Sequence, residues 1–370
     1  MKRLRVPKPF IFAVAAVFSG FVAGALLMLI IGKNPIVGYA ALFRGAVKNP
    51  AVSLSAVGQT LIMSAILCLS GLSLAFAGKV GLFNIGAAGQ MLIGGFAASV
   101  AVYRLPTDCP KALTIAVILV VGAFGGAVWA GVAGVLKARF GINEVVATIM
   151  LNWVAFWTVD YFVRNYFPRD AYVKTTSRVL PDAMSLRLQW LEKIFDSRFV
   201  NFGLFVAVAM VVLTWFIMNK TVFGFELRAV GANRFAAEYA GIHAGTGTVC
   251  AMLIAGALAG LAGVTYYLGY VTSIQVGVLP SYGYDGIAVA LVGQNSPGGV
   301  AAAALLFGVL RSGKDFMTIE TGIMNELADC VIAIIIYFSA AIMLYEKLSA
   351  KLTKKRAAAP AAAETGGGKP

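Results

Sequence analysis

The stretch Gly224–Ile242 reads GFELRAVGANRFAAEYAGI and is a polar segment between two long apolar ones. The apolar segment before it ends near Thr221, and the next one begins at Gly247. A polar, amphipathic piece between two membrane spans lies either on the membrane surface or in a partner protein. Which of these it does decides what the protein is. Its charged residues are Glu226, Arg228, Arg234 and Glu238.

The composition of the 370-residue chain is that of a membrane protein. Hydrophobic residues make up 60% of it and charged residues 12%, with a mean hydropathy of +0.85. Soluble domains have about 25% charged residues, so the sequence predicts an integral membrane protein. The formal net charge of +14 is typical of topology signals and anionic lipid headgroups, and it argues against a nucleic-acid partner.

The residues that most often build catalytic and metal sites are scarce. His243 is the only histidine, which excludes a histidine-based triad or a histidine metal cluster within this chain. The four cysteines have no metal-ligand spacing and are expected to be small apolar residues. We therefore predict no catalytic site and no metal site.

The apolar segments are long enough to cross a bilayer, whose core of about 30 Å needs about 20 helical residues. Beyond Tyr270, glycines and prolines interrupt the pattern and predict a broken segment over 271–299, with a short helix near Tyr284–Gln294. A second short or broken helix is expected near 78–90. The predicted spans are Phe10–Ile31, Ala51–Ala77, Asn84–Tyr103, Ala112–Leu136, Val145–Val163, Phe199–Met218, Thr248–Tyr270, the broken segment, Val300–Phe316 and Leu327–Tyr345.

Both ends of the chain are strongly basic, which places both in the cytoplasm and requires an even number of spans. Counting the broken segment as one crossing gives about ten. The predicted organisation is a basic N-terminus (1–9), one membrane domain (10–346) and a cytoplasmic, low-complexity tail (347–370) expected to be disordered. Within the membrane domain, loop 164–198 is expected outside and loop 220–245 in the cytoplasm.

A few polar residues within membrane sequence are candidates for a solute path, because such groups are costly there unless they have a role. Each has a structural alternative. The glycines around Asn84 and Gln90 also suit tight helix packing, Asp285 also suits the first turn of a helix, and Tyr284 also suits an interfacial anchor. The path candidates are Asn84, Gln90, Asn152, Tyr284, Asp285 and Gln294.

The other charges near the membrane lie close to predicted span ends, namely Glu144, Asp160, Lys314, Asp315 and Asp329. Carriers driven by protons or sodium usually hold ionisable groups deep in the bundle. The nearly charge-free interior therefore favours a neutral solute and an energy source outside this chain.

The polar stretch itself predicts two short helices, Phe225–Val230 and Arg234–Ala240, split at Gly231. Asn233 is a suitable N-cap and Gly241 a suitable C-terminal stop. One interpretation is an amphipathic turn lying on lipid headgroups. The other is a knob that docks into a cytoplasmic motor protein.

Four segments then give a resemblance that covers most of the chain, from about Lys33 to Tyr345. In order they resemble the permease family of bacterial ABC importers for nucleosides and simple sugars, a branched-chain/ribose-type family. The chain is most similar to the longer permease of nucleoside importers that use a basic-membrane-protein type lipoprotein receptor. The segments are GLFNIGAAGQMLIGG (81–95), EVVATIMLNWVAFWTVDYFV (144–163), FELRAVGANRFAAEYAGI (225–242) and GYDGIAVALVGQNSPGGVAAAALLFGVL (283–310).

This resemblance implies an all-α permease of the type II importer kind, without a catalytic site, in the bacterial cytoplasmic membrane. It implies three partners: a second, homologous permease, a double-cassette ATPase that carries ATP and Mg²⁺, and an outer binding lipoprotein. By the same resemblance the polar stretch is the coupling element to the ATPase. Its expected contact residues are Glu226, Arg228, Gly231, Arg234, Phe235, Ala236, Ala237, Glu238 and Gly241.

The resemblance leaves the substrate open. Purine nucleosides are expected first, and a simple sugar or riboflavin is the alternative. The chain departs from the family at Ala88, where an acidic residue is frequent, which weakens any role for a carboxylate in that turn. An ion-driven carrier and a membrane enzyme remain as less favoured classes.

Overall fold

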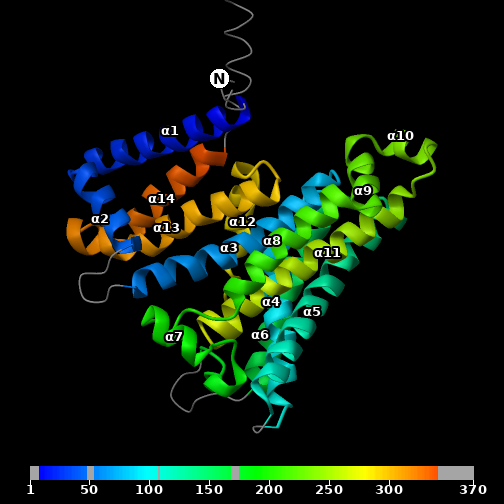
Figure 1. Cartoon of the computed structure of the whole chain (residues 1–370), viewed down its shortest axis with the longest axis horizontal. Helices are drawn as coiled ribbons and strands as arrows, with labels where there is room; N and C mark the ends of the chain where they lie inside the picture. Colours follow the sequence, from blue (N-terminus) through cyan, green and yellow to red (C-terminus); the bar gives the residue numbers. More distant parts are fainter. Residues whose placement is uncertain (1–7, 48–53, 107–108, 168–174, 341–370) are drawn as a thin grey trace, which may run out of the picture.

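The computed structural model describes residues 8–47, 54–106, 109–167 and 175–340. Within these ranges the chain is a bundle of helices (Figure 1), and the predicted all-α membrane fold is confirmed. Those residues contain no β-strand, and their only sheet-like pairings are two isolated bridges, Thr176 with Gln275 and Arg187 with Asn201.

The helices follow the apolar pattern of the sequence closely. They are α1 (Lys8–Ile30), α2 (Pro35–Val47), α3 (Ser55–Lys79), α4 (Ala87–Tyr103), α5 (Lys111–Phe140), α6 (Glu144–Tyr166), α7 (Gln189–Phe195), α8 (Gly203–Lys220), α9 (Val222–Ala232), α10 (Arg234–Tyr239), α11 (Ala244–Val264), α12 (Ser281–Val292), α13 (Pro297–Thr321) and α14 (Asn325–Ala340).

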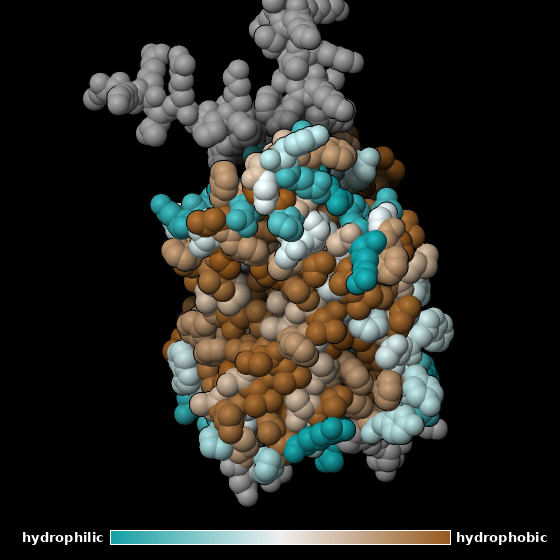
Figure 2. Space-filling view, turned by 90° about the vertical axis from the view of Figure 1, so that its right-hand side faces the viewer, coloured by the Kyte–Doolittle hydropathy of each residue, from teal (hydrophilic) through white to brown (hydrophobic). Residues whose placement is uncertain are grey.

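Five helical segments in the described residues are long and apolar enough to cross a membrane, and shorter apolar helices accompany them. The five are α3, α5, α6, α8 and α11 with its π-helical extension Thr265–Tyr270. Figure 2 shows a broad hydrophobic band around the middle of one face, with hydrophilic residues gathered at its two ends. This is the surface of a multi-pass membrane protein. The total of ten crossings stays a prediction.

Helix α3 forms the centre of the bundle (Figure 1). Its sequence is apolar on every side, as expected for a helix that other helices surround, and it is buried from Ile62 to Ala77. It packs against α2, α8, α11, α12 and α13. Any movement of α3 must therefore be passed to several neighbours.

Glycines set the closest contacts between helices, notably where α5 crosses α11. A Cβ atom at Gly256 would lie 2.3 Å from the carbonyl oxygen of Gly126, and one at Gly260 would lie 2.2 Å from that of Gly122. Small residues one helical turn apart allow two helix backbones to approach this closely in a membrane. Lipid provides no hydrophobic driving force, so this backbone packing holds α5 and α11 together.

Three features of the fold differ from the expectations. Helix α2 was not predicted, because 13 residues are too few for a span. It is held against α13, where a Cβ atom at Gly313 would lie 2.0 Å from the carbonyl oxygen of Leu42. Helix α13 is longer at both ends than the predicted span Val300–Phe316. The last turns of the predicted span Thr248–Tyr270 are π-helical.

The predicted termini lie mostly outside the described residues. Only Lys8 and Pro9 of segment 1–9 are described, at the start of α1, and nothing of 347–370 is. The predicted outer loop 164–198 is described from residue 175 onward, together with the end of α6. Its described part contains a 3₁₀ turn, Asp182–Met184, and helix α7.

We expect Gly256→Ala and Gly260→Ala to destabilise the protein, because the added methyl groups overlap backbone atoms of α5. Overpacking of this kind costs about 1–3 kcal/mol. Gly245→Ala is the matched control in the same helix, since its nearest neighbour would be Ala138 Cβ at 3.9 Å. Thermal unfolding of the detergent-solubilised protein measures the effect. Equal melting temperatures for all three variants would contradict the packing account.

Candidate functional site

The polar stretch forms a short arm of two helices at one end of the bundle (Figure 1). Helix α9 begins after Thr221, whose Oγ1 accepts a hydrogen bond from the Gly224 amide at 3.0 Å. Helix α10 begins after Asn233, whose side chain accepts one from the Ala236 amide at 3.1 Å. The chain then turns through Gly241 at φ +85°. The expected N-cap at Asn233 and stop at Gly241 are confirmed.

The expected split at Gly231 is wrong, because α9 runs through this glycine and ends at Ala232. Position 231 needs a glycine for a different reason. A Cβ atom there would lie 2.3 Å from the Lys79 carbonyl oxygen and 2.9 Å from Val80. The backbone of α9 thus lies directly against the end of α3, and the break between the two short helices falls at Asn233.

The arm has a buried side and an exposed side. Leu227, Val230 and Ala237 are buried against the bundle and hold the two helices in place. Phe225, Phe235 and Tyr239 are 60%, 74% and 95% exposed. Exposed aromatic side chains gathered at one place are typical of a protein contact. Arg234 and Glu238 form the expected ion pair at 3.2 Å, but both are exposed, so it adds little stability.

The expected coupling residues divide between these two sides. Glu226, Arg228, Arg234, Phe235, Ala236, Glu238 and Gly241 are exposed, Ala237 is buried, and Gly231 faces α3. A partner protein could reach the first group directly. Ala237 and Gly231 instead pack the arm against the bundle.

Three of the predicted path residues form one buried amide cluster. The Asn84 and Gln90 side chains exchange two hydrogen bonds of 2.9 Å. Asn152 of α6 accepts from the Gly89 amide at 2.8 Å and donates to the Ile85 carbonyl at 3.0 Å. The exposed fractions are 1% for Asn84, 2% for Gln90 and 2% for Asn152. These amides hold the α3–α4 connection, which favours the structural alternative.

Ala88, the departure from the family pattern, lies in the same region. A Cβ atom at Gly283 of α12 would come within 2.4 Å of the Ala88 Cα atom. The start of α4 and the start of α12 are therefore in backbone contact. A longer side chain at position 88 would meet α12.

Of the other predicted path residues, Tyr284 shares a side-chain hydrogen bond with Asn152 of this cluster. Tyr284 and Asp285 line a cavity of about 810 Å³ between α3, α12, α13 and α14. Gln294 lies in the α12–α13 turn at φ +53°, is exposed and does not line that cavity. The structure thus brings Tyr284 together with Asp285 at the cavity and with Asn152 of the amide cluster.

The cavity contains a charged residue that the sequence reasoning missed. Arg311 of α13 forms an ion pair with Asp285 and lies over the Tyr282 ring, 4.7 Å from its centre. Lys314 also pairs with Asp329 of α14 at 2.8 Å. The expectation of a nearly charge-free interior is therefore wrong here. The spacing of Arg311, Lys314 and Asp315 on one helical face was the signal that could have revealed the cluster.

Metal ligands do not gather anywhere in the described part of the chain. No group of three or more His, Cys, Asp or Glu side chains there could hold a metal ion. The site thus consists of two parts, the arm at one end of the bundle and the charged cavity beside α3. Close helix contacts lie between them.

The chain is similar to known ABC transporter permeases over most of its length. The guanosine ABC transporter permease NupP of Bacillus subtilis is 41% identical over 92% of this chain and 96% of its own length. The nucleoside ABC transporter permease NupB of Lactococcus lactis is 38% identical over 91% and 92%. The glucose ABC transporter permease TsgB13 of Haloferax volcanii is 29% identical over 96% and 93%.

More distant similarity extends to a second guanosine ABC transporter permease of Bacillus subtilis, NupQ, which is 27% identical over 69% of the chain. No solved structure matches. Residues 56–340 match the family described as the branched-chain amino acid transport system permease component. Since this match covers more than half of the chain and the all-α membrane fold agrees with it, the chain belongs to that family of transport permeases.

Proposed function

We propose that this chain is a permease subunit of an ATP-driven ABC importer that carries nucleosides, with purine nucleosides first. The observation that carries the proposal is the 41% and 38% identity, over nearly the whole chain, to permeases named for guanosine and nucleosides. A simple sugar is the second candidate, favoured by the 29% identity to a permease named for glucose. Riboflavin remains an alternative on the earlier resemblance alone.

The exposed side of the arm is proposed as the docking surface for the ATPase. Phe235 and Tyr239 would enter a groove of that partner, where aromatic side chains supply most of the binding energy. ATP and Mg²⁺ would bind only to the ATPase, and this chain would bind no cofactor. The complete importer would also contain a second permease and an outer binding lipoprotein.

Movement of the arm would reach the cavity through close backbone contacts. Gly231 of α9 abuts the Lys79–Val80 end of α3. Farther along α3, a Cβ atom at Gly286 of α12 would lie 2.3 Å from the Ser70 hydroxyl, and one at Gly71 would lie 2.7 Å from Val289. Helix α12 carries Tyr284 and Asp285 at the cavity. Interiors packed this tightly move in discrete steps and transmit displacement over a distance.

The charged cavity does not by itself indicate energy coupling to protons or sodium. An ion-driven carrier needs a buried carboxylate that is released to bind its ion. Of the three carboxylates that line the cavity, Asp285 and Asp329 are held in ion pairs, and the third, Asp315, is exposed. Family membership and the exposed arm both favour ATP as the energy source. We place the protein in the bacterial cytoplasmic membrane with the arm and both termini in the cytoplasm.

The uptake experiment uses the complete importer in liposomes, assembled with the proposed second permease, ATPase and lipoprotein from the same organism. We expect guanosine to accumulate when ATP is present on the ATPase side. Its uptake should stop when ATP is replaced by a non-hydrolysable analogue. Dissipating the proton gradient should have no effect. Uptake of glucose or riboflavin in place of guanosine would overturn the substrate, and uptake that follows the gradient would overturn the mechanism.

Gly231→Val tests the coupling path, because the new side chain must push α9 off the end of α3. An overlap that costs about 1–3 kcal/mol would lower guanosine uptake by about tenfold, while ATP hydrolysis continues. Ala232→Val is the matched control, since residue 232 is exposed on the same helix. Membrane insertion is checked by size-exclusion chromatography. Normal uptake by a correctly inserted Gly231→Val importer would contradict the path.

Asp285→Asn and Arg311→Gln test the cavity. Each leaves a charge without its partner and should destabilise the permease by about 2 kcal/mol, less than a fully buried pair would lose. The double variant should recover most of that stability, because neither charge remains. We expect its guanosine uptake to stay several-fold below wild type. A double variant with wild-type uptake would show that transport does not use the ion pair.

A further inference from the structure

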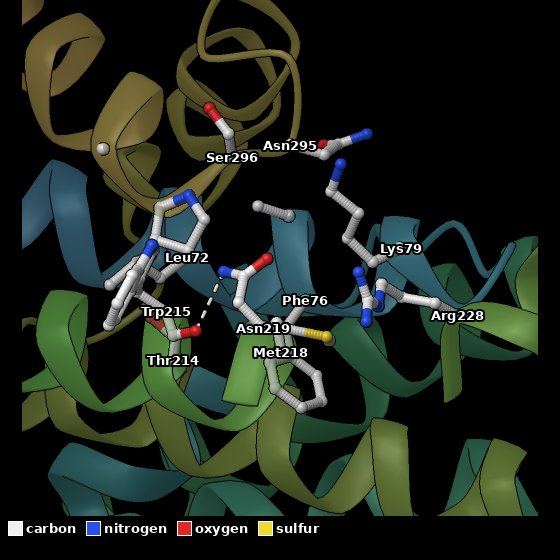
Figure 3. A pocket seen from close by; sticks show the side chains of 13 residues that line it. Leu72, Phe76, Lys79, Thr214, Trp215, Met218, Asn219, Arg228, Asn295 and Ser296 are labelled. Carbon is white, nitrogen blue, oxygen red and sulfur yellow. Dashed lines mark hydrogen bonds between the residues drawn. The ribbon is translucent and has the colours of Figure 1, made fainter. Parts of the chain in front are cut away.

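A second pocket, of about 410 Å³, lies between the end of α3, the end of α8, helix α9 and the α12–α13 turn (Figure 3). It is separate from the charged cavity, because the two share no lining residue. Arg228 of the arm lines it, and the proposed function assigns no ligand to it. Its polar lining includes Lys79, Asn219, Arg228 and Asn295.

The pocket is positively charged and has no internal counter-charge. Lys79 and Arg228 line it, and no aspartate or glutamate does. Neither side chain takes part in an ion pair among the described residues. The Arg228 Nε atom donates to the Gly224 carbonyl at 3.3 Å, which leaves the terminal nitrogens of the guanidinium for another acceptor. Two cations in one concave site favour an anion.

The remaining wall is apolar and lies deeper along the helices. Phe76 is one turn of α3 from Lys79, and Leu72 is about two turns away, a distance of about 10 Å along the axis. Trp215 and Met218 face the same pocket from α8 (Figure 3). The lining thus changes from cationic to apolar over the depth at which a lipid changes from headgroup to acyl chain. An acidic side chain of a protein would use only the cationic part.

The face of α8 beside the pocket is suited to contact lipid. Val208 and Val212 are each 60% exposed, and Phe216 is 51% exposed. Trp215 is 47% exposed, with the Lys220 ammonium 5.8 Å from its ring centre. Tryptophan beside a basic residue is the usual anchor at the boundary between hydrocarbon and headgroups. A lipid could therefore enter the pocket from the bilayer.

We propose that this pocket binds an anionic phospholipid, with the phosphate between Lys79 and Arg228 and the first part of an acyl chain along Leu72, Phe76 and Trp215. Basic pockets between membrane helices are a known way to recognise anionic headgroups. The bound phosphate would link the end of α3 to α9, the same two segments that meet at Gly231. The lipid would then stabilise the seated arm.

The experiment counts phosphatidylglycerol on the complete importer by native mass spectrometry. The importer is purified from vesicles of phosphatidylethanolamine and phosphatidylglycerol. We expect wild type to retain a phosphatidylglycerol molecule that Lys79→Gln and Arg228→Gln each bind about fivefold less, which corresponds to one basic residue near an anionic membrane surface. Arg139→Gln is the matched control, because it removes one positive charge near the end of α5 without lining the pocket.

Two outcomes would overturn the proposal. An equal loss of phosphatidylglycerol in Arg139→Gln would mean that the lipid only follows the overall charge. Unchanged retention in all variants, together with weaker ATPase association in Lys79→Gln and Arg228→Gln, would assign the pocket to an acidic side chain of the ATPase. Both readouts are independent of guanosine uptake, so failure here and failure of the proposed transport activity can be told apart.

Discussion

The contact between α9 and the end of α3 is the constraint on which the rest of the structure depends. A Cβ atom at Gly231 would lie 2.3 Å from the Lys79 carbonyl oxygen, so the two backbones meet with no side chain between them. Such a contact leaves no space between the backbones, and it fixes the arm to α3 at the centre of the bundle. The exposed aromatic residues of the arm can then be pulled by a partner only if α3 is pulled as well.

The same use of small residues continues through the bundle. Gly71 and Gly286 bring α12 onto α3, and Gly256 and Gly260 bring α11 onto α5. In a membrane, where lipid and apolar side chains are equally hydrophobic, backbone proximity and van der Waals packing replace the hydrophobic effect as the source of helix association. The bundle is therefore held together by its glycines, and in the proposed coupling path Asp285 and Arg311 lie at the end of this series of contacts.

The sequence was sufficient for the fold class, most helix positions and both caps of the arm, because hydropathy, Asn233 and Gly241 act locally. It was insufficient where distant segments meet. A glycine between two short helices, such as Gly231, suggests a hinge. In the structure it allows close contact with residues 79 and 80, which no local pattern reveals. The amides of Asn84, Gln90 and Asn152 resemble path residues until their hydrogen bonds, to each other for the first two and to the backbone for Asn152, are seen. Arg311 was missed because its partner, Asp285, lies on another helix.

The seated arm can be tested by measuring the distance between spin labels on Phe83→Cys, just after α3, and Glu226→Cys on α9, in a complete importer without its native cysteines. Pulsed electron–electron double resonance would record this distance in two states of the importer, without nucleotide and with ATP trapped. The labelled importer must first be shown to hydrolyse ATP. If α9 and α3 move as one body, the two distance distributions coincide. A new distance in the ATP state would mean that the arm swings independently of α3, and would contradict the account.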